Sequence, residues 1–110
     1  MIEVECNVSI KKNGASFLDP QKIQLLHEIK QCGSMRSAAK KLSISYQHAW
    51  NLIEEMNRIA PSPLVIKQRG GANGGGAEIS TYGIKMIDEY IQIKNQVKIL
   101  VNQINVEINL

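Results

Sequence analysis

The sequence contains few of the residues on which enzymes, metal sites and disulfide-bonded proteins depend. It has two cysteines and two histidines, and neither Cys6 nor Cys32 has a partner at metal-ligand spacing. Neither His27 nor His48 has an evident nucleophile or carboxylate partner for catalysis. We therefore expect no enzymatic activity, no disulfide framework, no metal site and no cofactor.

Long apolar runs are also missing. No N-terminal run resembles a signal peptide, and no segment approaches the roughly 20 apolar residues of a membrane-spanning helix. We expect a cytoplasmic protein with reduced thiols and no membrane partner. The length of 110 residues suits one compact domain, and an apolar share of 44% is enough to form its core.

Apart from the pair Glu54-Glu55, the middle of the chain has no acidic residues. No Asp or Glu lies between Glu28 and Glu54, or between Glu55 and Glu78. The basic residues and the histidine inside these intervals are Lys30, Arg36, Lys40, Lys41, His48, Arg58, Lys67 and Arg69. The net charge of +3 is modest, but its distribution is typical of a surface that binds a polyanion. An ordinary solvated basic face would show the same pattern.

Residues 33–60 predict two helices joined by a tight turn. Ala38 and Ala39 are small enough for close helix crossing, and Ser45 is a good N-cap for the second helix. The inward positions of this second helix recur three and four residues apart, and they are Ala49, Leu52, Ile53, Met56 and Ala60. This pattern favours a helix-turn-helix whose second helix enters the DNA major groove. A helical hairpin that binds nothing is the alternative.

A strand, a glycine-rich tip and a return strand are predicted next. The strand covers Leu64–Arg69, the tip Gly70–Gly76, and the return strand begins at Ala77. Such a hairpin directly after a recognition helix is a wing, which can lay cations and free backbone amides against DNA phosphates. A phosphate-binding P-loop is excluded because Ala77-Glu78 follows Gly76 in place of Lys-Ser/Thr. A simple flexible loop remains the alternative.

The N-terminal part alternates in polarity from Val4 to Lys12, with Val4, Cys6, Val8 and Ile10 on one face. This predicts a half-buried strand that pairs either with the wing or with a second subunit. Asp19-Pro20 then predicts a helix start, and Gly33 predicts its end.

A long final helix is predicted from Thr81 almost to Leu110, with Ser80 as its cap. Apolar positions along it form a seam for dimerisation, and they are Tyr90, Ile93, Val97, Leu100, Ile104 and Ile108. A domain of this size cannot cover so long a helix, so we expect a homodimer; a separate partner domain is the alternative. We therefore expect the chain to consist of two parts, a DNA-binding domain over residues 1–80 and a dimerisation helix over residues 81–110.

Residues of three kinds are candidates for contact with DNA: polar side chains of the two motif helices, basic residues, and glycines of the wing. They are Ser34, Arg36, Lys40, Lys41, Ser45, Tyr46, Gln47, His48, Asn51, Lys67, Arg69, Gly71, Asn73 and Gly74. Gln47 can read adenine through its amide, and His48 can donate to guanine or phosphate. A lone histidine near a helix start is more often simply solvent-exposed. Trp50 is assigned to packing under the wing or the first helix.

Short sequence motifs between Gly33 and Gly83 resemble those of one protein family. They are Gly33-Ser34, Ala38-Ala39, Ile44-Ser45-Tyr46, Ala49-Trp50, Met56-Asn57, Leu64-Val65, Gly70-Gly71, Gly74-Gly75-Gly76-Ala77 and Tyr82-Gly83. Together they resemble the N-terminal DNA-binding domain of the molybdate-dependent transcriptional regulators, the ModE family. The winged helix of LysR-type regulators is more distantly similar.

The resemblance implies a mainly α fold with a small β-sheet: a winged helix-turn-helix with an N-terminal strand and a long C-terminal dimerisation helix. It also implies a homodimer that reads a near-palindromic operator, with a link to molybdate or oxyanion metabolism. Family members continue into oxyanion-binding domains, whereas this resemblance stops at Leu110. Three ways of regulation stay open: a separate sensor protein as a partner, the abundance of this protein, or no effector at all. Gln47-His48 stands where the family often has a basic residue, which changes the expected operator.

Two functions of different classes follow. The first is a homodimeric winged-helix transcription regulator that binds double-stranded DNA. The second is a winged-helix module for protein–protein contacts without sequence-specific DNA binding. The two long acid-free intervals in the middle of the chain favour the first, and the modest net charge leaves room for the second.

Overall fold

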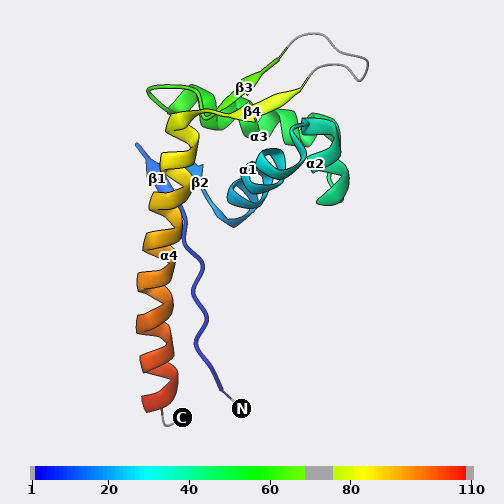
Figure 1. Cartoon of the computed structure of the whole chain (residues 1–110). Coiled ribbons are helices and arrows are strands. Elements are labelled where there is room, and N and C mark those ends of the chain that lie inside the picture. Colours follow the sequence, from blue (N-terminus) through cyan, green and yellow to red (C-terminus); the bar gives the residue numbers. More distant parts are fainter. Residues whose placement is uncertain (1, 69–75, 109–110) are drawn as a thin grey trace.

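A computed structural model of the chain describes residues 2–68 and 76–108 (Figure 1). Its described part is mainly helical, as the sequence predicted, and it contains two small antiparallel sheets where the sequence predicted one. In chain order the elements are β1 (Ile10–Lys12), β2 (Ala15–Leu18), α1 (Pro20–Cys32), α2 (Met35–Lys41), α3 (Tyr46–Ile59), β3 (Val65–Lys67), β4 (Ala77–Ile79) and α4 (Thr81–Glu107).

Each helix begins at a side chain that caps it. Asp19 accepts a hydrogen bond from the Lys22 amide, and Ser34, Ser45 and Ser80 do the same for α2, α3 and α4. Each cap satisfies one of the amides that the first helical turn leaves without a partner. Gly33 ends α1 in the left-handed conformation with φ of 67°, as predicted. The helix boundaries therefore follow from local chemistry.

The core lies where α1, α2 and α3 meet the start of α4. Ala38 and Ala39 are buried, which lets α2 pack closely. The inward stripe of α3 is buried as predicted at Ala49, Leu52, Ile53 and Met56, and Ala60 is half-buried. Leu25, Leu26 and Ile29 supply the buried face of α1. This packing fixes the orientation of α3, whose opposite face is left to solvent.

The predicted strand over Val4–Lys12 is wrong in its extent and its partner. Only Ile10–Lys12 forms a strand, and it pairs with β2 of the same chain. Asn13 and Gly14 both adopt positive φ, which turns the chain back within two residues. Residues 2–9 run alongside α4 without forming a strand, and Cys6 is exposed (Figure 1).

The side-chain amide of Asn105 holds this N-terminal segment against α4. Its Oδ1 accepts from the Val4 amide at 2.6 Å, and its Nδ2 donates to the Val4 carbonyl oxygen at 3.0 Å. Asn105 thus replaces the backbone of a neighbouring strand. Two backbone groups that the sequence assigned to a sheet are satisfied by a helix instead.

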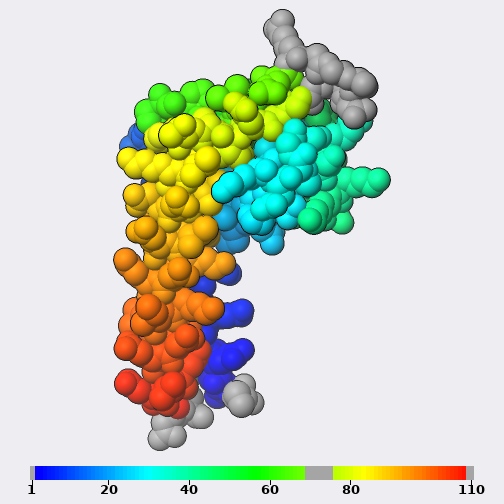
Figure 2. Space-filling model, in the orientation of Figure 1, coloured from blue at the N-terminus to red at the C-terminus, as the bar shows by residue number. Residues whose placement is uncertain are grey.

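The first turns of α4 belong to the core, and the remainder projects from it as a rod (Figure 2). Ile87 and Tyr90 are buried, and Gly83 lies so close to Leu64 that a Cβ atom there would meet the Leu64 carbonyl oxygen. The assignment of Tyr90 to a dimer seam is corrected. Tyr90 is 2% exposed and donates its hydroxyl proton to the Val8 carbonyl oxygen at 2.8 Å. It is therefore unavailable to a second copy.

Alkaline pH is expected to weaken this part of the fold through Tyr90. Burial, and then the negative charge of Asp19, raise the pKa of the Tyr90 hydroxyl above its ordinary value of 10.0. Because the folded state holds this proton more tightly than the unfolded state, the stabilisation is complete below about pH 10 and is lost at higher pH. Chemical denaturation between pH 8 and pH 11 should show a decline that Tyr90→Phe reduces. An equal decline in Tyr90→Phe would contradict this assignment.

Among the described residues, no helix is long and apolar enough to cross a membrane. The same residues contain no cluster of three or more His, Cys, Asp or Glu side chains that could hold a metal ion.

Candidate nucleic-acid interface

The turn between α2 and α3 sets the direction of α3. Ser43 adopts the left-handed conformation with φ of 57°, which lets the chain reverse at once after α2. Leu42 and Ile44 flank this residue and are half-buried against the core. The Ile44 amide donates to the Ala39 carbonyl oxygen at 3.0 Å, which fastens the turn to α2. The two helices therefore form a helix-turn-helix, as predicted.

The N-terminal half of α3 presents polar side chains to solvent. Tyr46, Gln47, His48 and Asn51 are all exposed, as the sequence predicted. The Gln47 side-chain amide donates to Asn51 Oδ1 at 2.9 Å, one turn further along the helix. This bond uses one of the two Gln47 amide protons, so Gln47 keeps its acceptor and a second donor. An amide with both functions can form a bidentate contact with adenine.

His48 is held by a residue of α1. Its Nε2 lies 3.3 Å from Nε2 of Gln21, a contact that connects α3 with α1. The Ser45 hydroxyl oxygen accepts from the His48 amide at 3.0 Å. Ser45 and Ser34 both use their hydroxyl oxygens as helix caps, and each still has a proton to donate to a phosphate.

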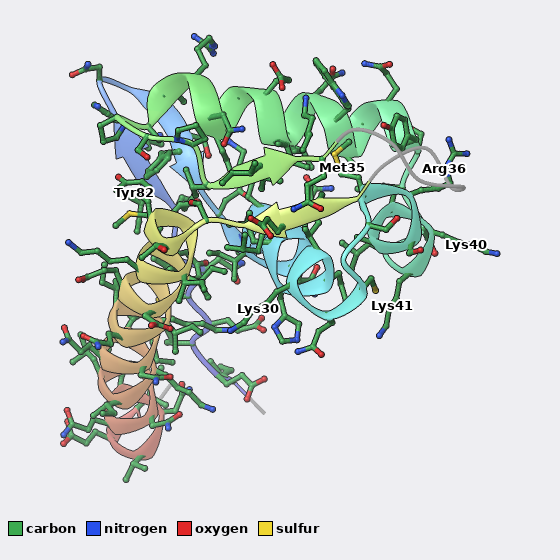
Figure 3. All side chains as sticks on the ribbon, turned by 45° about the horizontal axis from the view of Figure 1, so that its top comes forward. Lys30, Met35, Arg36, Lys40, Lys41 and Tyr82 are labelled. Carbon is green, nitrogen blue, oxygen red and sulfur yellow. The ribbon has the colours of Figure 1, made fainter. Side chains whose placement is uncertain are left out.

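Basic side chains project from α2, and one of them, Arg36, lies beside the start of α3 (Figure 3). The Arg36 guanidinium lies 5.3 Å from the centre of the Tyr46 ring, which orders both side chains. Lys40 is exposed, and Lys41 Nζ lies 3.3 Å from a carboxylate oxygen of Glu28. Cations along the first helix of such a motif can contact phosphates while the second helix faces the bases.

The wing is formed by β3 and β4, which pair from Val65–Ile79 to Lys67–Ala77. Of its predicted DNA contacts, Arg69, Gly71, Asn73 and Gly74 lie outside the described residues. Lys67 is described, and its ammonium is already engaged. Lys67 Nζ lies 2.6 Å from Glu54 Oε1 and 3.6 Å from the centre of the Trp50 ring. Trp50 therefore packs against the wing, as predicted.

Asn57 fixes the wing to α3, and the sequence reasoning missed this role. Its Oδ1 accepts from the amides of Leu64 and Val65 at 2.9 Å and 3.3 Å, and its Nδ2 donates to the Val65 carbonyl oxygen at 3.1 Å. The amide side chain thus acts as a short strand beside β3. The sequence did contain a signal for this role, since Asn57 is a polar residue in the last turn of the predicted helix and lies close to a predicted strand.

Lys22 is a second position that was missed. It is 2% exposed, and its ammonium donates to the Ser16 carbonyl oxygen at 2.8 Å and to Glu55 Oε1 at 2.9 Å. These bonds connect α1 with both β2 and α3. The carboxylate of Glu55 keeps access to solvent, which lowers the cost of placing this pair at the edge of the core.

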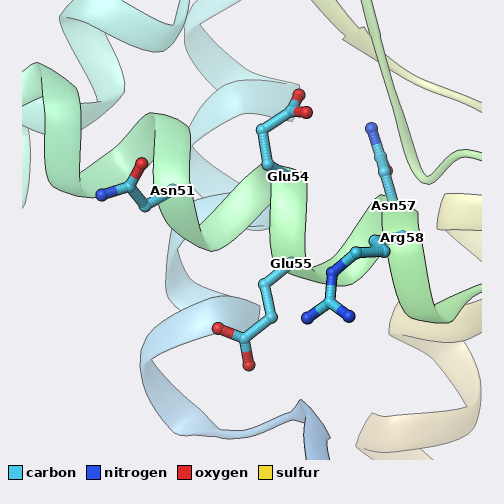
Figure 4. A pocket seen from close by; sticks show the side chains of 5 residues that line it. All are labelled: Asn51, Glu54, Glu55, Asn57 and Arg58. Carbon is cyan, nitrogen blue, oxygen red and sulfur yellow. The ribbon is translucent and has the colours of Figure 1, made fainter.

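A polar hollow on the outer side of α3 is lined by Asn51, Glu54, Glu55, Asn57 and Arg58 (Figure 4). Glu54 points away from Glu55 and Arg58 in this view. The two carboxylates that line the hollow bind different lysines. Glu54 binds Lys67, and Glu55 binds Lys22. Each acidic residue of α3 therefore attaches the helix to a different neighbouring element.

Comparison with curated proteins finds transcriptional regulators. A protein of Haemophilus influenzae described as "Transcriptional regulator ModE" is 43% identical over 90 residues, which are 82% of this chain and 35% of that protein. The "DNA-binding transcriptional dual regulator ModE" of Escherichia coli K12 is 38% identical over 81% of this chain and 34% of its own length. The chain thus spans about a third of the length of the curated relatives it matches. No protein-family model matches it.

Solved structures with the same fold confirm the winged helix-turn-helix. A CbnR DNA-binding domain in complex with DNA has a TM-score of 0.57 at 14% identity, covering 76% of this chain and 90% of that one. Staphylococcus aureus MepR, also solved with DNA, has a TM-score of 0.58 at 20% identity, covering 78% of this chain and 64% of that one. A LysR family transcriptional regulator, VV2_1132, has a TM-score of 0.58 at 17% identity, covering 79% of this chain and 28% of that one, so the likeness to LysR-type regulators is one of fold. The resemblance to ModE regulators is confirmed by the sequence relatives.

Proposed function

We propose that this homologue of the ModE transcriptional regulators binds double-stranded DNA and regulates transcription as a homodimer. The observation that carries the proposal is the exposed start of α3, where Tyr46, Gln47, His48 and Asn51 face solvent beside the cations of α2. A helix of a helix-turn-helix that shows such side chains can enter the major groove and contact base edges. The regulator relatives support this function over that of a protein-interaction module.

The projecting part of α4 supports the homodimer. Three apolar side chains of the predicted seam stay exposed in the single chain: Ile93 at 37%, Leu100 at 56% and Ile104 at 38%. A second copy of α4 can cover them along a two-fold axis. Each α3 would then meet a half-site, with half-sites one helical turn of about 34 Å apart, or a multiple of it.

The regulated genes are proposed to concern molybdate or another oxyanion. One relative, from Azotobacter vinelandii, is described as "Molybdenum transport protein ModE" and is 31% identical over 93% of this chain. We further propose that the signal reaches this chain through a separate sensor protein. Measuring operator affinity with and without molybdate, with purified protein and with cell extract, tests this part independently of DNA binding.

Binding of random duplexes across a salt series tests the proposed function itself. A DNA-binding domain should shift such duplexes at low salt, and its affinity should fall steeply as salt rises. Selection of bound fragments from a random pool should then yield a near-palindromic site. A protein-interaction module would shift no duplex and would yield no enriched sequence.

Base-reading and phosphate-contacting residues should respond differently to substitution. Gln47→Ala is expected to cost about 1–3 kcal/mol on the selected site, with little change on random duplexes, because it removes a base contact. Lys40→Ala should weaken binding to all duplexes alike and reduce the salt slope by about one. Lys98→Ala removes the same charge from the far part of α4 and is the control. Identical effects of all three substitutions would contradict this division.

A further inference from the structure

An acidic residue, Glu54, lies on α3 three positions after Asn51 (Figure 4), and its carboxylate contacts Lys67 of the wing. It is the first acid after the basic stretch that begins beyond Glu28. A carboxylate at such a position repels the phosphates that a DNA-binding face must approach. The contacts of Glu54 indicate what its carboxylate does at this position.

Glu54 holds the ammonium of Lys67, the described cation of the wing. The two groups are 2.6 Å apart, and both side chains are partly open to solvent. The face of the Trp50 indole lies 3.6 Å from the same ammonium, so Lys67 is bound from two sides. The carboxylate and the ring both belong to α3, and together they bring the lysine back from the wing toward the helix.

A phosphate must compete with this arrangement. A free lysine that binds a phosphate releases about one counterion, and this release is the main source of affinity for DNA of any sequence. A lysine paired with a carboxylate belongs to an ion pair whose net charge is zero, so the pair attracts a phosphate less than a free lysine does. Any new phosphate contact either breaks the ion pair or brings the phosphate close to Glu54.

We propose that Glu54 is a specificity-determining residue that competes with DNA phosphate for Lys67 and so weakens binding to non-cognate DNA. The inference rests on the proposed function and names a role for a residue within it. Specificity is a difference between two affinities, so it rises when phosphate contacts that are common to all sequences are weakened. Base contacts from Gln47 and Asn51 are left intact.

Direct reading of cytosine by Glu54 is the competing assignment. A carboxylate can accept a hydrogen bond from the cytosine N4 amino group. The geometry favours the pairing of Glu54 with Lys67 over a contact with cytosine, because one carboxylate oxygen of Glu54 is already bonded to Lys67 on the wing side of the helix. The two roles predict opposite effects of removing the charge.

The test is the affinity of Glu54→Gln for random and selected duplexes. Glutamine keeps the size of the side chain and removes its charge. Random duplexes should bind roughly 3- to 10-fold more tightly at about 0.1 M salt, and the salt slope should steepen by about one, as expected for one added phosphate contact. The ratio of selected to random affinity should fall. Glu78→Gln, which removes an exposed carboxylate of β4, is the charge-matched control and should have a clearly smaller effect.

The dependence on Lys67 separates competition from simple repulsion. In a Lys67→Met background, Glu54→Gln should leave the salt slope unchanged and give less than half of its former gain in affinity. An equal gain in both backgrounds would overturn the inference, and so would weaker binding of Glu54→Gln to sites with one particular C·G pair. Thermal melting of each variant confirms that it is folded.

A spectroscopic measurement gives a second, independent test. Lys67 side-chain protons near the Trp50 ring should show upfield NMR shifts. In the protein without substitutions, these shifts should persist when it binds random duplexes. In Glu54→Gln they should be lost upon binding, because the ammonium moves to a phosphate. Loss of the shifts in both proteins would overturn the inference. If the original protein and all variants fail to bind any duplex, it is the proposed function that fails.

Discussion

Introducing glutamate at Leu100 and Ile104 together is expected to convert the protein to monomers and to lower its affinity for a palindromic site roughly 100- to 10,000-fold. The two side chains lie four residues apart on α4, and both are exposed in the single chain. Two added carboxylates would face the same charges across a two-fold axis. Binding would then depend on one half-site. Sedimentation equilibrium and titration of a palindromic duplex measure the two effects.

Asn95→Glu combined with Asn102→Glu is the control. These residues are also exposed on α4 and lie on the opposite side of the helix from Leu100 and Ile104. The control adds the same charge and should remain dimeric with full affinity. A control that dissociates while the Leu100 and Ile104 variant stays dimeric would show that the other side of α4 forms the contact. If neither variant dissociates, α4 does not hold the dimer together.

Lys22→Ala is expected to lower the free energy of unfolding by about 2–4 kcal/mol. The substitution removes a buried aliphatic chain and leaves the Ser16 carbonyl oxygen without its hydrogen-bond donor. It also frees Glu55 from its attachment to α1. Since α3 loses a contact that fixes its orientation, affinity for the selected duplex should fall even at temperatures where the variant is fully folded.

Lys30→Ala is the matched substitution, because Lys30 lies on the same helix and is exposed. It should change the free energy of unfolding by less than about 0.5 kcal/mol. Urea denaturation of both variants, followed by DNA titration at low temperature, separates stability from orientation. Equal stability of the two variants would show that the Lys22 ammonium contributes nothing to the fold.

Helix ends could be predicted because their chemistry is local. Asp19, Ser34, Ser45 and Ser80 each bond to an amide three residues ahead, so a short stretch of sequence contains both partners. The inward stripe of α3 follows from the helical repeat in the same way. The exposed start of α3, and hence the candidate site on it, could be inferred from these two features.

Contacts between distant parts of the chain could not be predicted. The alternation from Val4 to Ile10 suits a strand and equally suits an extended segment on a helix, and the partner Asn105 is 101 residues away from Val4. The pairs Lys22–Glu55 and Lys67–Glu54 join residues 33 and 13 positions apart. From the sequence alone, a charged residue on a helix is expected to face solvent, because its partner in the fold is not known.

The hydrogen bonds between Val4 and Asn105 have a practical consequence. They place residues 2–4 beside residues 105–108 at the tip of the rod, at the opposite end of α4 from α3 (Figure 1). The molecule is 58 Å long, so an affinity tag or a biotin added at residue 2 would lie far from α3, the proposed DNA-binding helix. Surface-immobilised protein should therefore keep its full capacity for duplexes, whereas a label on α2 should obstruct them.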